Sequence, residues 1–361
     1  MPPPPAPLSN IDWARLSLTV ADIVNGHVET TWSSENNTWT APTFVKDPYL
    51  RVHGLSPALN YGMQAYEGLK ASRSAEDTIT IFRPTFHHRR LVQSSAAVCL
   101  PAVPEDIFLS SISLAVRANA EFVGPGDSAA VLYLRPVIFA SAPQLALEPS
   151  PTCTLAIYAQ PATTYHGVRP VPCLVLDNFD RAATRGTGYA KIGGNYAPVI
   201  KYSQEAKQKG FPITLHLDSE TQSEIEEFST SGFVGVLKGV EGRDDGCAKG
   251  TLVVPNSTQI IDSVTSDSVL ALAKELGYKV ERRTVKYTEL GQFDEVLAVG
   301  TAAGVLPISA IVRESLSDKF EYCPTGDAGP AAVELASALT AMLKGLAEDK
   351  NGWRYEVAFT D

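Results

Sequence analysis

Residues 185–196 read RGTGYAKIGGNY and place a single lysine, Lys191, among four glycines. Glycine lets the main chain approach a ligand closely or adopt positive φ angles. A lysine held in such a segment can lose solvation and serve as an amine nucleophile or base. A solvated lysine in a glycine-rich surface turn is the alternative interpretation of the same residues.

Three polar stretches further along the chain carry groups that could complement this lysine. EIEEFSTSGF (residues 224–233) places carboxylates between apolar residues, so one can point inward and needs a cationic or protonated nitrogen partner. DSVTSDS (262–268) is typical of a helix cap, and a helix start also offers N–H groups to a phosphate. GTAAG (300–304) predicts a tight turn or a second anion-binding loop.

Two arginines are candidate phosphate partners. Arg90 lies in HHRRL and Arg181 in NFDRAA, and each could instead pair with a surface carboxylate. His87 and His88 stand apart from other ligand types, so we predict no metal site. An amine, a carboxylate, two anion-binding turns and arginines are together the groups that pyridoxal phosphate (PLP) requires.

The composition indicates a folded, acidic protein. The 361 residues are 44% hydrophobic and 19% charged, and 40 acidic side chains outnumber 30 basic ones. This sign of charge disfavours nucleic acid and anionic membranes as partners, and no apolar window of about 18 residues predicts a membrane span. Five scattered cysteines favour free thiols in a reducing compartment, so we expect a cytoplasmic protein, with mitochondrial import left open.

The length predicts two domains. We expect a small N-terminal domain at residues 1–165 that begins with a flexible proline-rich tail at 1–10. The segment YHGVRPVP (165–172) has no helical or strand period, so residues 166–172 are expected to be a linker. A larger C-terminal domain follows at 173–361, in which the glycine-rich residues 239–250 predict a hairpin loop.

Hydrophobic periodicity predicts an α+β fold. Strands are expected at residues 79–82, 131–137, 154–158, 214–217, 233–237, 251–254 and 296–299. Helices are expected where apolar residues recur three and four apart, at residues 84–99, 106–122, 195–208 and 266–276.

Five motifs occur in order along the chain: LNYGMQAYEGLKASR (59–73), FRP with a following arginine (82–90), LYLRPV (132–137), GTGYAKIGGNY (186–196) and EFSTSGF (227–233). Through them, the sequence from about residue 47 to 307 resembles the branched-chain aminotransferases of the class IV, fold-type IV PLP enzymes, especially fungal members. The resemblance implies a two-domain, D-amino-acid-aminotransferase-like fold with a C-terminal pseudo-barrel and the cofactor between the domains. It also implies a homodimer.

The resemblance further implies roles for individual residues. Lys191 would form a Schiff base with the cofactor, Tyr196 would hydrogen-bond its phenolic oxygen, and Glu227 would face its pyridine nitrogen. The remaining cofactor contacts would come from Arg90, Arg181, Thr230, Val264, Thr265 and Thr301. The substrate pocket would contain Tyr61, Tyr66, Tyr133, Tyr165, Arg135 near a distal carboxylate, and the main-chain amides of Thr301 and Ala302.

We therefore expect an aminotransferase that moves the amino group of a branched-chain or other hydrophobic L-amino acid to 2-oxoglutarate. Its role would be amino-acid biosynthesis or the tailoring of a secondary metabolite. A D-amino-acid or (R)-amine transaminase and an aminodeoxychorismate-type lyase are alternatives on the same fold. A non-catalytic PLP-binding protein is the alternative of another class.

The sequence departs from the family pattern in two regions. Gly232 stands where many members have asparagine, and Ser263 and Ser266 replace a glycine and an arginine of the later phosphate turn. We expect a phosphate cup that is built differently. Ala303 and Leu306 replace the redox C-x-x-C of some animal members, so thiol regulation is not expected there.

Overall fold

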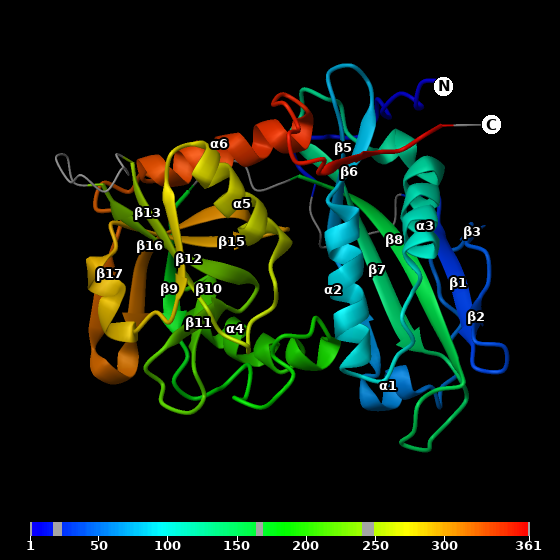
Figure 1. The fold of residues 1–361 in the computed structure, drawn as a ribbon, viewed down its shortest axis with the longest axis horizontal. Coiled ribbons are helices and arrows are strands. Elements are labelled where there is room, and N and C mark those ends of the chain that lie inside the picture. Colours follow the sequence, from blue (N-terminus) through cyan, green and yellow to red (C-terminus); the bar gives the residue numbers. More distant parts are fainter. Residues whose placement is uncertain (1, 17–23, 164–168, 240–248, 360–361) are drawn as a thin grey trace. The chain divides into compact units, whose positions relative to one another are not determined.

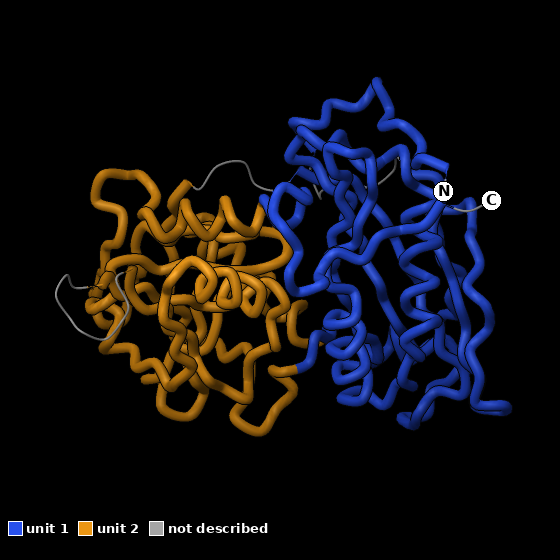
Figure 2. Tube along the Cα trace, turned by 45° about the horizontal axis from the view of Figure 1, so that its top comes forward, with its two compact units in different colours: residues 1–166, 190–193, 341–361 blue, residues 167–189, 194–340 orange. Residues whose placement is uncertain are grey.

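The computed structural model describes residues 2–16, 24–163, 169–239 and 249–359. The chain divides into two compact units, which Figure 2 shows in different colours. Unit 1 comprises residues 1–166, 190–193 and 341–361, and unit 2 comprises residues 167–189 and 194–340. The division differs from the predicted domains because the segment that carries Lys191 and the end of the chain both pack with unit 1.

Unit 1 is built on an antiparallel nine-stranded sheet (Figure 1). Its strands are β1 (His27–Ser33), β2 (Thr38–Trp39), β3 (Thr43–Val45), β4 (Gln64–Tyr66), β5 (Leu69–Arg73), β6 (Ile79–Phe82), β7 (Ala130–Ala140), β8 (Thr152–Thr163) and β18 (Arg354–Glu356). The main path runs β18-β6-β5-β7-β8-β1-β2, and both β4 and β5 pair with β7. The three strands predicted in this half of the chain lie within β6, β7 and β8.

Two longer helices lie against this sheet. The helices of unit 1 are α1 (Pro57–Tyr61), α2 (Pro84–Ala96), α3 (Glu105–Ala118) and the 3-10 helix η1 (Ala120–Phe122). The buried residues of α3 include Phe108, Ile112 and Ala115, whose spacing of three and four confirms the predicted helix. It ends earlier than predicted because Asn119 leaves helical geometry and its side-chain amide donates to the Ala115 carbonyl at 2.9 Å.

The proline-rich start of the chain is hydrogen-bonded to other residues of unit 1. The buried Arg73 donates from Nη2 to the Pro5 carbonyl at 2.7 Å, and the Leu8 N–H donates to the Glu121 carbonyl at 3.0 Å. The sequence predicted a flexible tail at residues 1–10, because proline runs form no regular hydrogen-bonded structure of their own. In the structure these main-chain carbonyl and N–H groups find partners within unit 1.

Unit 2 contains a sheet that closes on itself. Its strands are β9 (Val171–Val175), β10 (Ile213–Leu217), β11 (Ile225–Phe228), β12 (Ser231–Lys238), β13 (Gly250–Pro255), β14 (Lys279–Arg283), β15 (Glu295–Gly300), β16 (Gly304–Arg313) and β17 (Asp318–Glu321). The path runs β11-β10-β9-β16-β15-β12-β13-β14, and an additional β11–β12 pairing closes a ring. Buried side chains such as Leu215, Phe228 and Ile311 form its core.

In unit 2 the helices and connecting segments begin and end at residues that differ slightly from the predicted ones. They are α4 (Val199–Gln208), α5 (Val264–Glu275), α6 (Pro330–Lys344, which continues into unit 1), and the 3-10 helices η2 (Gly193–Asn195), η3 (Tyr287–Gln292) and η4 (Glu314–Leu316). α4 begins after Pro198, because the residue before a proline is biased away from helical geometry. Pro172, predicted in the linker, belongs to β9, while residues 164–168 and most of the predicted 239–250 loop lie outside the described residues.

The start of α6 is capped by a buried carboxylate from the barrel. Glu295 on β15 accepts hydrogen bonds from the N–H groups of Ala331 and Ala332, both at 3.0 Å. A carboxylate satisfies N–H groups that have no partner within the helix and interacts favourably with its dipole. Gly329 allows this approach, since a Cβ there would lie 2.1 Å from the Glu295 carboxyl carbon.

We expect Glu295→Gln to lower the free energy of unfolding by about 1–3 kcal/mol, because the amide turns an acceptor into a donor that faces an N–H group. Urea denaturation followed by circular dichroism measures this change. Glu314→Gln is the control. It removes an exposed ion pair with Lys209 and should change the free energy by less than about 0.5 kcal/mol. Equal effects of the two substitutions would contradict the capping role.

Candidate active site

The Lys191 segment is joined to unit 1 by main-chain hydrogen bonds. The Tyr66 N–H donates to the Lys191 carbonyl at 3.1 Å, and the Lys191 N–H donates to Ser94 Oγ at 2.9 Å. Ile192 forms a bridge with Ala65 on β4. A Cβ at Gly193 would lie 1.9 Å from Nε2 of Gln64, so this glycine permits the close approach. Lys191 is therefore fixed against β4 and α2.

One face of α2 presents three buried polar residues. His87, Arg90 and Ser94 are spaced at i, i+3 and i+7, so they share a face. All three are buried, and Ser94 is the residue that accepts from the Lys191 N–H. The sequence placed Arg90 at a phosphate, and the structure puts it on the same helix face that holds the lysine segment.

A fully buried carboxylate, Glu67, pairs with this helix face. Arg90 donates from Nε to Oε1 at 2.6 Å and from Nη2 to Oε2 at 2.8 Å, and His87 Nδ1 lies 2.7 Å from Oε2. Although burial alone would raise the pKa of Glu67, the Arg90 and His87 side chains hold it well below its usual range. Burial lowers the pKa of His87 despite the nearby Glu67. The cluster is thus a carboxylate and guanidinium pair beside a neutral imidazole.

Tyrosine rings lie beside a second arginine and the lysine. The Tyr66 ring centroid lies 4.6 Å from Lys191 Nζ and 5.0 Å from Arg135 Cζ, and Arg135 Cζ is 5.5 Å from the Tyr133 ring. A Cβ at Gly68 would lie 2.0 Å from the Tyr133 hydroxyl, so the ring requires glycine there. Unit 1 therefore brings together Lys191, Tyr66, Tyr133 and Arg135.

The two remaining tyrosines predicted in the substrate pocket are not part of this cluster. Tyr61 ends α1, is about half exposed, and donates from its hydroxyl to the Leu145 carbonyl at 2.7 Å. Tyr165 lies outside the described residues.

In unit 2, Arg181 and Glu227 form a buried ion pair. Arg181 Nη2 also donates to the Gln259 carbonyl at 3.2 Å and the Gly188 carbonyl at 3.4 Å. Gly188 permits this packing, since a Cβ there would lie 2.2 Å from the Gln259 oxygen. The sequence placed Arg181 near the phosphate, whereas its partner in the structure is the carboxylate predicted to face the pyridine nitrogen.

Two further titratable groups lie near this pair. Burial raises the pKa of Glu226 to about 7, although Arg181 lowers it and Glu227 raises it further. His216 Nε2 lies 2.8 Å from the Ser229 hydroxyl, which also bonds Thr214. Burial, reinforced by the charge of Arg181, lowers the pKa of His216 to about 3. A neutral imidazole therefore lies close to the arginine of the ion pair.

The N-terminus of α5 carries the expected helix cap, which includes Ser263 and Ser266, the residues at which the sequence departs from the family's phosphate turn. Ser263 is the N-cap, and its Oγ accepts from the Ser266 N–H at 3.2 Å. Thr265 Oγ1 lies 3.3 Å from Thr301 Oγ1, which joins two predicted phosphate contacts, and the neighbouring Val264 is buried. Gly232 belongs to the same region, because a Cβ there would lie 2.7 Å from Ser266 Oγ. The two departures from the family pattern are therefore coupled in space.

A cavity of about 240 Å³ opens beside this helix start. Its polar lining residues include Glu227, Asn256, Ser263, Ser266 and Arg282. Ser266 Oγ is buried and has no hydrogen-bond partner among the described residues. A buried hydroxyl without a described partner, the N-terminus of a helix and a carboxylate in the same lining fit a group that has a phosphate at one end and a basic ring nitrogen at the other. The site thus fits PLP.

The other predicted residues of unit 2 lie on turns. Tyr196 is half-buried between η2 and α4, and Thr230 is exposed in the turn between β11 and β12. Ala302 follows Thr301 in the turn between β15 and β16. Thr301 and Ala302 thus occupy the tight turn predicted from GTAAG.

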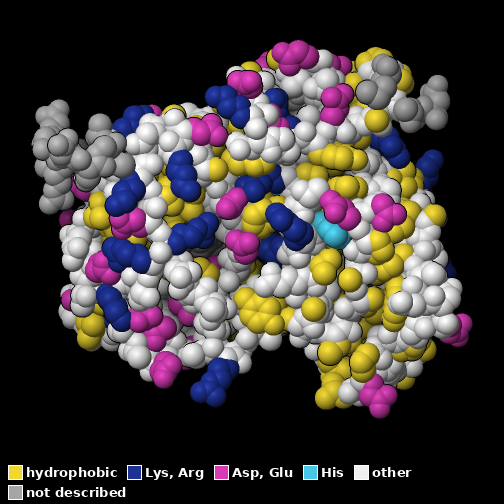
Figure 3. Space-filling model, in the orientation of Figure 1, with side chains coloured by type: hydrophobic (Ala, Val, Ile, Leu, Met, Phe, Trp, Pro, Cys, Tyr) yellow, Lys and Arg dark blue, Asp and Glu magenta, His cyan; other side chains and the backbone are white. Residues whose placement is uncertain are grey.

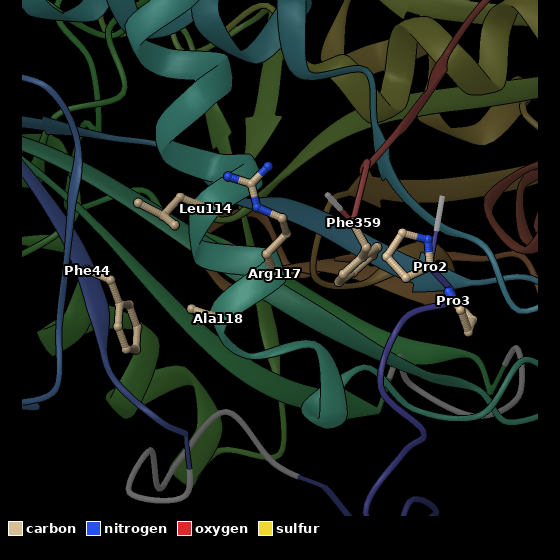
Figure 4. Close-up of a pocket in the computed structure, with 7 residues that line it drawn as sticks. All are labelled: Pro2, Pro3, Phe44, Leu114, Arg117, Ala118 and Phe359. Carbon is tan, nitrogen blue, oxygen red and sulfur yellow. The ribbon is translucent and has the colours of Figure 1, made fainter. Parts of the chain in front are cut away.

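A second cavity, of about 430 Å³, lies in unit 1 (Figure 4). It is lined by Pro2, Pro3, Phe44, Leu114, Arg117, Ala118 and Phe359. This set contains one charged side chain and no carboxylate or lysine, so it lacks the groups for amino-group chemistry. Acidic and basic side chains are interspersed on the face of the molecule that Figure 3 shows.

The described residues offer neither a metal site nor a membrane-spanning helix. Within these residues no group of three His, Cys, Asp or Glu side chains could hold a metal ion. None of the helices in the described part of the chain is long and apolar enough to cross a membrane.

Sequence reasoning missed Glu67, His87, His216 and Glu226 as parts of these clusters. For the α2 face a signal existed, because His87, Arg90 and Ser94 fall on the side of a helix that must be buried, and buried polar groups need partners. Glu67, by contrast, is a lone acid in the motif YEG, and nothing local to it indicates complete burial.

Comparison with known proteins identifies the class. Residues 64–311 match the family described as amino-transferase class IV, and the chain belongs to this family. The chain is 47% identical over 351 residues to the aminotransferase poxL of Penicillium oxalicum, covering 97% of this chain and 94% of the relative. It is thus an aminotransferase, and class IV aminotransferases use PLP as cofactor.

Solved structures support the same fold. A branched-chain aminotransferase from Thermoproteus uzoniensis with norvaline superposes with a TM-score of 0.73 at 26% identity, covering 91% of this chain and 99% of that one. The branched-chain amino acid aminotransferase of Escherichia coli gives a TM-score of 0.73 at 26% identity, covering 88% of this chain and 97% of that one. The chain therefore has the two-domain fold-type IV architecture, and the closed sheet of unit 2 is its barrel.

The buried histidine of unit 2 gives a pH-dependent prediction. The unfolded chain binds a proton on His216 near pH 6.5, whereas the native protein does so only near pH 3, so stability is lost as pH falls below about 6.5. We expect His216→Gln to reduce the loss of unfolding free energy between pH 7 and pH 5 by about 2 kcal/mol. Urea denaturation at both pH values measures it. His53→Gln, which removes an exposed histidine, is the control, and a parallel loss in H216Q and wild type would contradict the assignment.

Proposed function

We propose that this aminotransferase moves the amino group of a branched-chain or other hydrophobic L-amino acid to 2-oxoglutarate. The observation that carries the proposal is the placement of Arg135 over the rings of Tyr66 and Tyr133. Such a pocket can accept two kinds of side chain, because the aromatic rings contact an apolar group and the guanidinium pairs with a carboxylate. The norvaline complex of the Thermoproteus uzoniensis enzyme supports a hydrophobic donor.

The proposal assigns the cofactor contacts as the family resemblance implies. Lys191 would carry the cofactor covalently, Tyr196 would donate to its phenolic oxygen, and Glu227, paired with Arg181, would hold a proton on its ring nitrogen. The phosphate would bind Arg90 and the α5 start, where Val264, Thr265, Ser266 and Thr301 lie. Thr230 and the amides of Thr301 and Ala302 would complete the cofactor and α-carboxylate contacts. A cytoplasmic location is part of the same proposal.

During the reaction, residues of this chain would transfer a proton and orient the reacting groups. PLP, when bound, supplies an electron sink that makes the substrate Cα acidic. Lys191 Nζ would then accept the Cα proton, since a lysine amine placed at the reacting carbon can serve as the general base. Tyr66, whose ring lies 4.6 Å from Nζ, would orient this amine and exclude water from one side. Arg135 would orient the distal carboxylate of the acceptor.

The first test is a screen of amino-acid donors, with both enantiomers of each and with 2-oxoglutarate as acceptor. The rate is measured as the formation of glutamate. We expect L-leucine, L-isoleucine or L-valine to react and their D-enantiomers not to. Lys191→Ala should lower the rate at least about 100-fold, because a general base alone contributes about 10²- to 10⁴-fold. Lys201→Ala, at an exposed lysine of α4, is the control and should leave the rate unchanged.

Each alternative has its own outcome in this screen. Reaction of D-amino acids or (R)-amines alone would replace the proposal with the other transaminase type. Pyruvate release without an amino acceptor would indicate the lyase. Full activity of Lys191→Ala would overturn the assigned base.

A homodimer is the second part of the proposal. Four apolar side chains of unit 1 are exposed around α1 and the loop after β7: Leu55, Leu59, Leu145 and Leu147, of which Leu147 is 82% exposed. The Tyr61 hydroxyl joins the helix to the loop through the Leu145 carbonyl. In Figure 3 hydrophobic side chains gather over this region, the position of α1 in Figure 1. We call these residues the α1 surface; clustered exposed apolar residues are typical of protein interfaces.

Light scattering should give twice the mass of one chain for the wild-type protein. The double substitution Leu59→Asp and Leu147→Asp should shift the mass toward that of the monomer, since burying two carboxylates in an apolar contact is unfavourable. Leu346→Asp, at a leucine that is 72% exposed elsewhere in unit 1, is the matched control and should leave the dimer intact. A monomeric wild-type protein would contradict the proposal.

A further inference from the structure

Glu67 lies at a break in the strand pairing of unit 1. Tyr66 on β4 stands opposite Val137 of β7, and Leu69 on β5 stands opposite Leu134. The register is the same on both sides of the break, so Glu67 faces Pro136. The Glu67 N–H donates to the Pro136 carbonyl at 2.8 Å, as in a hydrogen-bonded antiparallel pair.

Because of Pro136, this pair of residues has only one of the two usual main-chain hydrogen bonds. Two residues opposite each other in such a pair normally exchange two hydrogen bonds, but proline has no N–H to return. The Glu67 carbonyl instead accepts a hydrogen bond from Arg135 Nε at 2.8 Å. The residue next to the proline thus supplies the missing donor with its side chain, and this bond fixes the direction of the Arg135 guanidinium.

The side chain of Glu67 lies on the face of the sheet opposite to the Arg135 side chain, because the side chains of successive residues in a strand point to alternate faces. There it meets Arg90 through two parallel hydrogen bonds, from Nε and Nη2. Two parallel bonds between a planar guanidinium and a planar carboxylate fix both the plane and the direction of the arginine. His87 holds the carboxylate from the same helix, so the pair does not depend on one contact alone.

We propose that Glu67 is the positioning residue shared by both arginines of the site. Its carboxylate orients Arg90, and its main-chain carbonyl, left available by Pro136, orients Arg135. The inference rests on the proposed roles of Arg90 at the cofactor phosphate and Arg135 at the distal carboxylate of the acceptor. Glu67 itself contacts neither cofactor nor substrate and acts through the two guanidinium groups.

The first half of the proposal, in which the Glu67 side chain orients Arg90, is called the side-chain half. It is tested by cofactor binding to the apoenzyme. Dissociation constants are measured by absorbance for PLP and for pyridoxal, which has the same ring and no phosphate. Glu67→Gln should weaken PLP about 10- to 100-fold, because its amide donors face the Arg90 N–H groups, and should leave pyridoxal unchanged. Arg90→Ala should show the same selectivity, and the double variant should bind PLP no more weakly than Arg90→Ala alone.

Two variants separate this role from general loss of structure. Glu67→Asp keeps the charge on a side chain one methylene shorter and should weaken PLP less than Glu67→Gln. Asp77→Asn removes the half-exposed carboxylate that pairs with the buried Arg73 at 2.5 Å in the same unit, and should not change the affinity for PLP.

Two outcomes would overturn the side-chain half, and a third would overturn the role of Arg90 on which it rests. Equal weakening of PLP and pyridoxal in Glu67→Gln would indicate general disruption, and unchanged PLP affinity would remove the role of Glu67. A phosphate-independent effect of Arg90→Ala would instead overturn the proposed role of Arg90, on which the inference rests. The single Arg90 variant therefore distinguishes failure of the proposed function from failure of the inference.

The second half of the proposal, in which the main-chain carbonyl of Glu67 orients Arg135, is tested at Pro136. The measurement is ligand binding to the PLP-loaded enzyme. Pro136→Ala restores an N–H that competes with Arg135 for the Glu67 carbonyl. It should weaken glutarate, a dicarboxylate of the acceptor's length, about 3- to 10-fold and leave the monocarboxylate 4-methylvalerate unchanged. Pro161→Ala, at the β8 proline opposite Leu132, is the matched control and should change neither. Unchanged glutarate binding in Pro136→Ala, or equal weakening of both ligands, would overturn this half.

Discussion

The buried carboxylate of Glu67 is the constraint on which the arrangement of unit 1 depends. Removing a carboxylate from water is unfavourable unless it is paired and hydrogen-bonded. Here Arg90 and His87 supply that compensation from one face of α2, so the helix must approach the sheet where β4 meets β5. The same helix face carries Ser94, which binds the Lys191 N–H. The ion pair, the helix and the lysine segment therefore depend on one another.

The segment at residues 190–193 packs with unit 1, whereas the residues before and after it in the sequence belong to unit 2. Its main chain bonds to Tyr66 and Ser94, and Gly193 packs against Gln64 without a side chain in between. These contacts place Lys191 in unit 1, while Glu227 and Arg181 lie in unit 2. Each unit thus holds one part of the proposed catalytic set, and within each part buried charged side chains are paired.

Local patterns predicted much of the fold, because periodicity reflects burial directly. β6, β7, β8 and the helix α3 follow from their alternating or three-and-four spacing, and α4 differs only where Pro198 delays its start. The motifs also pointed to Lys191, Arg90 and Arg135. Glu67 could not be predicted in this way. Its burial arises from a helix face and a strand that are distant in sequence, and its open carbonyl arises from a proline on β7.

Stability alone does not account for a buried pair of this kind. Well-packed apolar side chains of similar volume often stabilise a protein as much as or more than a buried ion pair does. What the pair adds is direction, because two parallel hydrogen bonds hold a guanidinium in one plane. By comparison, Arg73 contacts Asp77 through a carboxylate that is half exposed, where water competes for the charge. The full burial of Glu67 suits an arginine that must keep one orientation before any ligand arrives, since preorganised groups lose less freedom on binding.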